Sequence, residues 1–196
     1  MRTKRTERRE EILAATWQLI ARQGLRAANM RAIAAEVGYA NGALAYYFAG
    51  KDDLVRGAYE YVLKQTAARI QLATEKQHGL AALRAFCAEI IPADELKLLE
   101  ARIVIPFWEG AIHEPAFARL HEEGIADWRK QIRRHLREAE QLGEARALSA
   151  KATAVLVEQL LSILAGAQVL GVLSGDVHTS RMQNQVVEAF LDGLRP

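Results

Sequence analysis

The sequence predicts an all-α protein of about nine helices. Hydrophobic residues make up 51% of the 196-residue chain, with alanine and leucine abundant and proline limited to four residues. Alanine and leucine favour helix, and proline interrupts it. Nowhere do β-branched residues alternate with polar ones for long, which is the pattern of a half-buried strand. We therefore expect no sheet.

The first helix is predicted from about Thr6 to Gln23, because apolar residues recur there at helical spacing and Gly24 ends the run. Its stripe consists of Ile12, Leu13, Thr16, Trp17, Leu19 and Ile20. A short second helix follows Asn29, which can cap it, and stops at Gly38.

A third helix is expected from about Asn41 to Tyr47, and the segment FAGKDDL opens a long fourth helix that should reach about Gln77. Asp52 and Asp53 lie in the first turn of that helix, where the positive end of the helix dipole stabilises carboxylates. Proline, glycine and aspartate signals bound five more helices, at about 80–91, 95–113, 115–142, 149–173 and 180–194.

The segment Val155–Leu173 is apolar on nearly every face and long enough for a membrane span. Glu158, Gln159 and Gln168 fall inside it, however, and no basic flanks or aromatic belts accompany it. A soluble helix of this kind is buried on all sides when one face packs in its subunit and the other on a second subunit. We expect a homodimer and no membrane contact, with Leu164 and Gly171 as candidate seam positions.

Charge is uneven along the chain. Residues 1–51 carry nine Lys/Arg against four Asp/Glu, whereas residues 52–196 carry 17 against 20. A basic front end favours nucleic acid as its partner, and a solvated terminus is the alternative. The single cysteine, Cys87, lies in an apolar helical segment and is expected to be a core residue rather than a redox sensor. With no apolar signal segment at the basic N-terminus, the chain is expected to be cytoplasmic.

Two short helices joined by VGY behind a longer helix match a helix-turn-helix unit, whose last helix enters the DNA major groove. Leu44 and Phe48 are expected to face inward with Ile33. The outward positions are Asn41, Ala43, Tyr46 and Tyr47.

These side chains suit a groove. Asn41 can pair with adenine, the Ala43 methyl can contact thymine, and tyrosine can donate to phosphate. Gly42 permits close approach, and Lys51 at a helix start makes a phosphate site. Five basic residues would add sequence-independent attraction: Arg2, Lys4, Arg5, Arg8 and Arg9.

The segment NMRAIAAEVGYANGALAYYFAGKDDL resembles the DNA-binding signature of the TetR family of bacterial regulators. The resemblance implies an N-terminal helix-turn-helix domain, residues 1–51, and a C-terminal ligand-binding and dimerisation bundle, residues 52–196. It also implies a dimer that binds double-stranded operator DNA and a small-molecule effector. By position, Arg31 matches a base-contacting residue. The predicted DNA-binding residues are Asn29, Arg31, Asn41, Gly42, Ala43, Tyr46, Tyr47 and Lys51.

The sequence departs from this pattern at two places. Ala45 stands where most members have a phosphate-binding tyrosine, and Ala40 stands where serine or threonine usually caps the recognition helix. Asn41 is an alternative cap, a role that would compete with base reading.

The segments PFWEGAIHEPAFARL and LAGAQVLGVLSG resemble the C-terminal half of choline-responsive repressors of betaine synthesis. Trp108 and Glu109 could hold a cation by ring quadrupole and charge, with His113 one turn further along. The alternative is that Trp108 is core and the other two lie near a surface. Gln159 or Gln168 could face a ligand or pair across the dimer seam. The predicted ligand-binding residues are Phe86, Trp108, Glu109, His113 and Gln159.

No cofactor or metal is expected. A metal site formed by Glu109, His113 and His121 is disfavoured, because Pro115 should turn the chain before His121. The basic stretch WRKQIRRHLRE could form a second nucleic-acid patch, but nearby glutamates favour a solvated face.

The sequence predicts a ligand-responsive transcriptional regulator, most simply a repressor. An enzyme is disfavoured, because no catalytic carboxylate pair, Ser/His/Asp set or phosphate loop is present in the sequence. A helix-turn-helix used only for protein interaction is the remaining alternative, and the basic N-terminal arm argues against it.

Overall fold

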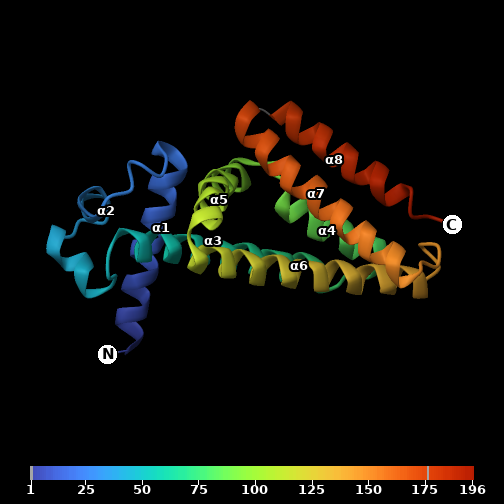
Figure 1. Ribbon diagram of the computed structural model, residues 1–196, viewed down its shortest axis with the longest axis horizontal. Coiled ribbons are helices and arrows are strands. Elements are labelled where there is room, and N and C mark those ends of the chain that lie inside the picture. Colours follow the sequence, from blue (N-terminus) through green and yellow to red (C-terminus); the bar gives the residue numbers. More distant parts are fainter. Residues whose placement is uncertain (1, 176) are drawn as a thin grey trace. The chain divides into compact units, whose positions relative to one another are not determined.

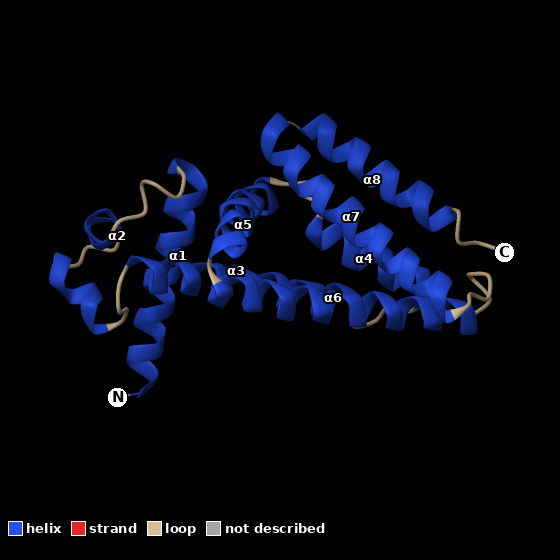
Figure 2. Ribbon diagram, in the orientation of Figure 1, coloured by secondary structure: helices blue, strands red, loops and turns tan. Residues whose placement is uncertain are grey.

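The computed structural model is helical throughout the residues that it describes, 2–175 and 177–196, with the side chains of residues 2, 3, 41, 177 and 178 left aside (Figures 1 and 2). Within these ranges there are eight α-helices, one 3-10 helix and no strand. The predicted all-α fold is confirmed.

The elements, in chain order, are α1 (Arg2–Gln23), α2 (Met30–Glu36), η1 (Asn41–Tyr46), α3 (Lys51–Thr74), α4 (Gly79–Ile90), α5 (Glu95–His113), α6 (Pro115–Gln141), α7 (Ala150–Ser174) and α8 (Val177–Asp192). Each predicted helix corresponds to one of them. The largest differences are that α1 begins four residues early, α3 ends three residues short of Gln77 and α8 begins three residues early.

The chain forms two compact units. The N-terminal unit comprises Met1–Gln65 and Leu99–Leu120, and the C-terminal unit comprises Thr66–Leu98 and His121–Pro196. Helices α3, α5 and α6 contribute residues to both. The functional division into residues 1–51 and 52–196 stays a prediction.

The core of the N-terminal unit joins α1, α2, η1 and the first part of α3. Ile33 and Leu44 are fully buried and Phe48 nearly so, as the helix-turn-helix pattern predicts. The stripe of α1 lies against them, and the Thr16 hydroxyl is satisfied within the helix by donating to the Ile12 carbonyl at 2.7 Å. The outward positions of η1 are set by this burial.

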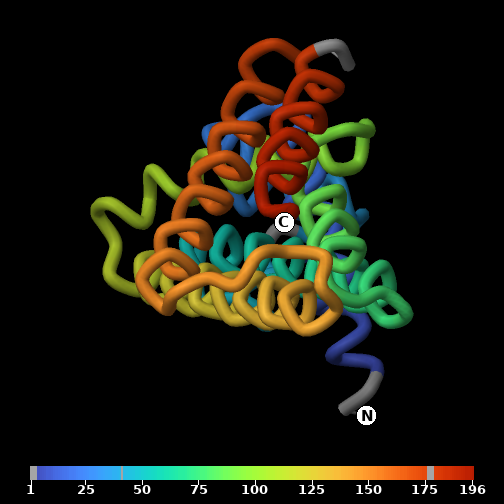
Figure 3. Tube along the Cα trace, turned by 90° about the vertical axis from the view of Figure 1, so that its right-hand side faces the viewer, coloured from blue at the N-terminus to red at the C-terminus, as the bar shows by residue number. Residues whose placement is uncertain are grey.

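The core of the C-terminal unit lies among α4, α6, α7 and α8. Helices α7 and α8 form an antiparallel pair (Figures 1 and 3), and α6 adds Ile132 and Leu136. Cys87 is buried here, and burial raises the pKa of its thiol to about 12. At neutral pH it is therefore protonated, which agrees with a core residue and not with a redox sensor.

Helix α7 has two different faces. Leu164 is fully buried, and a side chain at Gly171 would collide with Pro92, so these two candidate seam positions face the core of their own unit. The outward face instead carries Val155, Gln159, Ser162, Leu170 and Leu173. By length and composition α7 could cross a membrane, with 39% of its most apolar window buried. The sequence could not tell the faces apart, because both are apolar.

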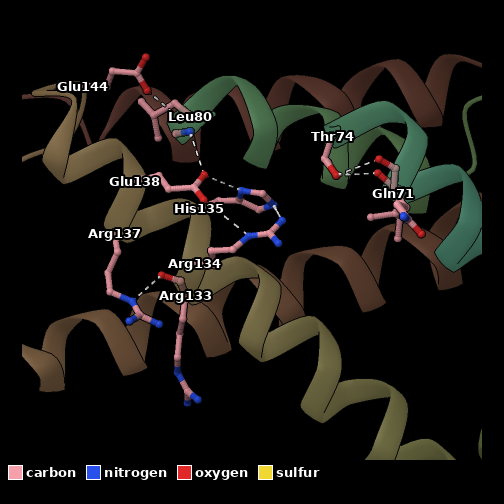
Figure 4. A network of polar contacts seen from close by, with 11 residues as sticks. Gln71, Thr74, Leu80, Arg133, Arg134, His135, Arg137, Glu138 and Glu144 are labelled. Carbon is pink, nitrogen blue, oxygen red and sulfur yellow. Dashed lines mark hydrogen bonds and ion pairs between the residues drawn. The ribbon is translucent and has the colours of Figure 1, made fainter. Parts of the chain in front are cut away.

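A polar network ties α6 to the start of α4 (Figure 4). His135, 1% exposed, has Nε2 3.1 Å from Nη2 of Arg134 and Nδ1 3.2 Å from Oε2 of Glu138. Since the guanidinium can only donate, Nε2 accepts and Nδ1–H donates to the carboxylate. Glu138 also accepts from the Gly79 N–H at 3.4 Å.

The network caps α4 from outside. His78, at the N-cap position, makes no side-chain cap bond. The free N–H groups of the first turn are instead satisfied by carboxylates, since Leu80 N–H donates to Glu144 at 2.8 Å and Gly79 N–H to Glu138. Negative charge at this end also suits the helix dipole.

Burial lowers the pKa of His135 and outweighs the opposing hydrogen bond to Glu138; the positive charge of Arg134 lowers it further. The unfolded chain, with a histidine pKa of about 6.5, therefore takes up a proton before the folded chain does as the pH falls. The contribution of neutral His135 to stability is complete above about pH 6.5 and declines below it.

We expect the His135→Asn substitution to make the loss of stability between pH 7 and 5 shallower than in the wild type, because one group that titrates differently in the two states is removed. Urea unfolding at a fixed protein concentration measures it. His121, whose pKa is also lowered by burial, should maintain part of the slope. Equal slopes for wild type and His135→Asn would contradict the assignment.

Candidate nucleic-acid interface

The turn between α2 and η1 is a Schellman motif. Asn29 caps the start of α2 by accepting from Ala32 N–H at 3.0 Å, as predicted. At the other end, Tyr39 N–H donates to the Ala34 carbonyl at 2.8 Å and Gly38 N–H to the Ala35 carbonyl at 3.2 Å. Gly38 has φ of +69°, which glycine adopts without strain. This turn fixes the direction in which the chain enters η1.

The recognition segment is a single 3-10 helix rather than the α-helix of its neighbours. Ala40 holds its N-cap position and makes no side-chain cap bond, and whether Asn41 caps instead stays a prediction. A methyl group cannot satisfy the free N–H groups at the helix start. The Asn41 side chain lies outside the described residues.

Tyr46 is the most exposed aromatic residue of this segment, at 66%. Its ring meets the edge of the Tyr47 ring at 5.0 Å, and the Arg5 guanidinium lies 5.0 Å from its centre. Tyr47 is half-buried against the core. A cation over a tyrosine face is attractive by about 0.5–1 kcal/mol at an exposed site. The sequence placed both residues on the DNA side but did not predict that Arg5 holds Tyr46.

Gly57 of α3 lies close to α1 and to Phe48, which comes two residues after η1. A methyl group there would come within 2.9 Å of Leu13, 3.4 Å of Arg9 and 3.7 Å of Phe48. Arg9 also lies 5.0 Å from the centre of the Phe48 ring. Glycine inside a helix costs about 0.5–1 kcal/mol relative to alanine. Close packing explains why it stands here, and sequence reasoning missed it.

The start of α3 combines Lys51 with a self-contained cap. Asp53 accepts from Ala49 N–H at 3.1 Å and from Arg56 at 2.6 Å. Burial works to raise the pKa of Asp53, but these hydrogen bonds together with the charge of Arg56 hold it below its usual range. Lys51 is exposed beside this cap. A cation at a helix start suits a phosphate oxygen.

The remaining predicted DNA-binding residues differ in how exposed they are and in whether their side chains already have hydrogen-bond partners. Arg31 and Gly42 are exposed, and Ala43 is half-buried. Both amide atoms of Asn29 bond to the local backbone, since Nδ2 donates to the Ala27 carbonyl at 3.3 Å. Of the basic arm, Lys4 is exposed and Arg8 pairs with Glu11 at 2.8 Å.

Trp108 of the predicted ligand site lies beside an aromatic cluster of the N-terminal unit. Tyr59 stacks on Phe107 with ring centres 3.3 Å apart, and Phe107 stacks on Phe117 at 4.8 Å. Burial raises the pKa of Tyr59, whose oxygen accepts a hydrogen bond from the Trp108 indole. Tyr59 and Phe117 come from other helices, so no local pattern indicated them.

The other predicted ligand residues are dispersed. Glu109 and His113 are exposed on α5. In the C-terminal unit, Phe86 is fully buried, with its ring edge-on to Trp128 at 6.0 Å, and Gln159 lies on the outward face of α7. Among the described residues no three His, Cys, Asp or Glu side chains lie close enough together to hold a metal ion. These assignments stay predictions.

Two of the five cations in the basic stretch of α6 are paired with carboxylates of their own unit. Arg129 forms two hydrogen bonds with Glu158, at 2.7 and 3.0 Å, and Arg134 lies 3.6 Å from Glu138. This agrees with a solvated face rather than a second nucleic-acid patch.

Two family patterns match the chain. Residues 12–58 match the pattern described as bacterial regulatory proteins of the tetR family, and residues 79–196 match that of the C-terminal domain of BetI-type transcriptional repressors. The chain belongs to the TetR family. Its members are transcriptional regulators and not enzymes, which confirms the class predicted from the helix-turn-helix signature.

Relatives and solved structures agree with this assignment. The HTH-type transcriptional regulator BetI of Stenotrophomonas maltophilia is 31% identical over 58% of this chain and 59% of its own. The fold is similar to a TetR regulator from Haloarcula marismortui, with TM-score 0.86, 21% identity and 96% and 98% of the two chains covered. A transcriptional regulator from Saccharomonospora viridis, solved in complex with choline, gives TM-score 0.83 and 23% identity over 93% and 96%.

We expect Lys51→Ala to weaken binding to every duplex sequence and to make the slope of log affinity against log salt shallower by about one unit, because one phosphate contact is lost. Fluorescence anisotropy over a salt series measures both. Lys76→Ala, at an exposed lysine in the turn after α3, is the control and should change neither.

Tyr46→Ala should weaken binding to a preferred operator more than to random DNA, while Tyr46→Phe maintains the ring over which Arg5 lies and removes only the hydroxyl. Comparison of the two variants separates ring contacts from hydroxyl contacts. Equal losses on operator and random DNA would show that Tyr46 contacts only the backbone.

Proposed function

We propose that this protein is a cytoplasmic transcriptional repressor that binds a palindromic operator as a dimer and is released by a small-molecule effector. The observation that carries the proposal is the helix-turn-helix of the N-terminal unit, in which Tyr46 is exposed, supported by Arg5, and followed by Lys51 at the start of α3. This arrangement presents an aromatic donor on the short η1 and one cation each on α1 and α3. The BetI-type C-terminal domain supports effector control.

Operator binding is tested by selection from random duplexes with the full chain. A two-fold symmetric dimer should enrich a palindrome with half-site centres separated by one helical turn, about 34–36 Å, or a multiple of it. Failure to enrich any sequence, together with binding that does not depend on salt, would favour the alternative of a protein-interaction module.

The outward face of α7 and the neighbouring part of α8 are the proposed subunit interface. A groove of about 660 Å³ is lined by Ala154, Val155, Glu158, Gln159, Ser162, Ile163 and Phe190. Val155, Leu170, Leu173, Met182 and Val186 are large apolar side chains exposed on these two helices. An apolar surface of this extent is typical of a protein interface. A second copy buries it by two-fold symmetry.

We expect Val155→Glu to shift the protein from dimer to monomer at micromolar concentration, because a charge in the centre of an apolar seam has no partner there. Sedimentation equilibrium measures the change. Leu72→Glu places the same charge on α3 at a residue that is 75% exposed, and it should leave assembly unchanged. A wild-type chain that sediments as a monomer contradicts the proposed interface.

A small cation is the first effector class to examine. Trp108 and the neighbouring Glu109 offer a ring face and a carboxylate, and the Saccharomonospora relative was solved with choline. Choline and a library of small metabolites are therefore the probes for a thermal-shift screen, since a ligand that binds only the folded state raises the melting temperature.

An effector from this screen should lower operator affinity by about 5- to 150-fold, the range of a typical coupling free energy. By linkage, operator DNA must lower effector affinity by the same factor. Titrations of the effector with and without operator measure both. Identical effector affinities in the two titrations would rule out ligand-controlled release.

A further inference from the structure

Gln168 is exceptional among the buried polar side chains of the C-terminal unit. It is 5% exposed, and its Oε1 has no hydrogen-bond partner within the described part of the chain. Other buried polar groups are satisfied there. The Thr74 hydroxyl donates to the Ile70 carbonyl at 2.8 Å, and the Ser180 hydroxyl to the Pro92 carbonyl at 2.6 Å. His135 has two partners.

Gln168 lies on the inward face of α7. The buried residues of this helix are Val157, Leu160, Leu161, Leu164, Ala167, Gln168 and Gly171. Successive helical residues are about 100° apart, so Gln159, nine positions earlier, points in the opposite direction. Gln159 indeed lines the outward groove. A second subunit on that groove cannot reach Gln168, which removes cross-seam pairing as an explanation.

An unpaired carbonyl oxygen in an apolar core is unfavourable, because it has lost its hydrogen bonds to water and gained none. Leucine or methionine would fill a similar volume without that cost. The unpaired oxygen of Gln168 therefore points to a hydrogen-bond donor on a molecule that is not part of the chain.

We propose that Gln168 is an effector-recognition residue, whose side-chain oxygen accepts a hydrogen bond from a hydroxyl or N–H group of a small polar molecule. This inference rests on effector control as proposed above and specifies the ligand's chemistry; its site, in the C-terminal unit, is an alternative to Trp108 and Glu109, which belong to the N-terminal unit. A quaternary ammonium group has no N–H, so choline could satisfy Gln168 only through its hydroxyl. A site of this kind rejects an otherwise identical molecule that lacks the donor, because the oxygen is then left unpaired.

The first test uses the ligand-free protein. Gln168→Met removes the unpaired oxygen at similar volume, so its melting temperature should equal or exceed that of the wild type. A clear drop would show that the oxygen already has a partner, such as an ordered water, and would overturn the proposal. Gln141→Met, at an exposed glutamine at the end of α6, is the matched control and should melt with the wild type.

The second test uses ligands. Wild type, Gln168→Met and Gln141→Met are screened by thermal shift with small hydroxyl and N–H metabolites, including choline and its hydroxyl-free analogue ethyltrimethylammonium. The compound that stabilises the wild type should bind Gln168→Met about tenfold or more weakly and Gln141→Met equally well. Its donor-free analogue should bind wild type and Gln168→Met alike.

The outcomes separate the two claims. Equal affinity of wild type and Gln168→Met for the effector overturns the role of Gln168 while leaving ligand-controlled repression intact. A wild type that no compound stabilises contradicts effector control itself, and this inference fails with it.

Discussion

The core shared by α1, η1 and α3, which includes Leu13, Leu44 and Phe48, is the constraint on which the DNA-reading unit depends. At Gly57 of α3 a methyl group would lie 2.9 Å from Leu13, which would have to shift, and 3.7 Å from Phe48, which is an ordinary contact. Leu44 lies within η1 and Phe48 two residues after it, so their burial orients that short helix. Because a six-residue 3-10 helix has little stability of its own, tertiary packing must hold Tyr46 outward.

The same packing explains how a weakly capped segment can present a reading surface. Ala40 supplies no cap, yet Leu44 and Phe48 are buried and the Schellman turn at Gly38 sets the entry of the chain. Arg5 then reaches Tyr46 from α1. The basic arm therefore has a structural contact with the recognition segment as well as a general attraction for phosphate.

In the C-terminal unit, the two faces of α7 differ in what covers them. Its inward face packs on α4 and α8, and Gly171 approaches Pro92 in the segment after α4, whereas its outward face remains exposed in a single chain. Polar groups are confined to places where they find partners, as His135 does with Glu138 and Arg134. Gln168 on the inward face departs from that rule, because its side-chain oxygen has no hydrogen-bond partner and can accept a hydrogen bond from a ligand.

The sequence by itself determined the helices, the helix-turn-helix and the family, because these depend on local periodicity, on caps such as Asn29, and on a motif of fixed spacing. It also assigned the inward roles of Leu44 and Phe48 correctly. Tertiary structure decided which face of α7 is buried, since an evenly apolar helix carries no periodic signal, and it therefore reversed the assignments of Leu164 and Gly171. It likewise brought Tyr59 and Phe117 to Phe107 and left Gln168 without a partner, because contacts between distant segments follow from packing and not from spacing along the chain.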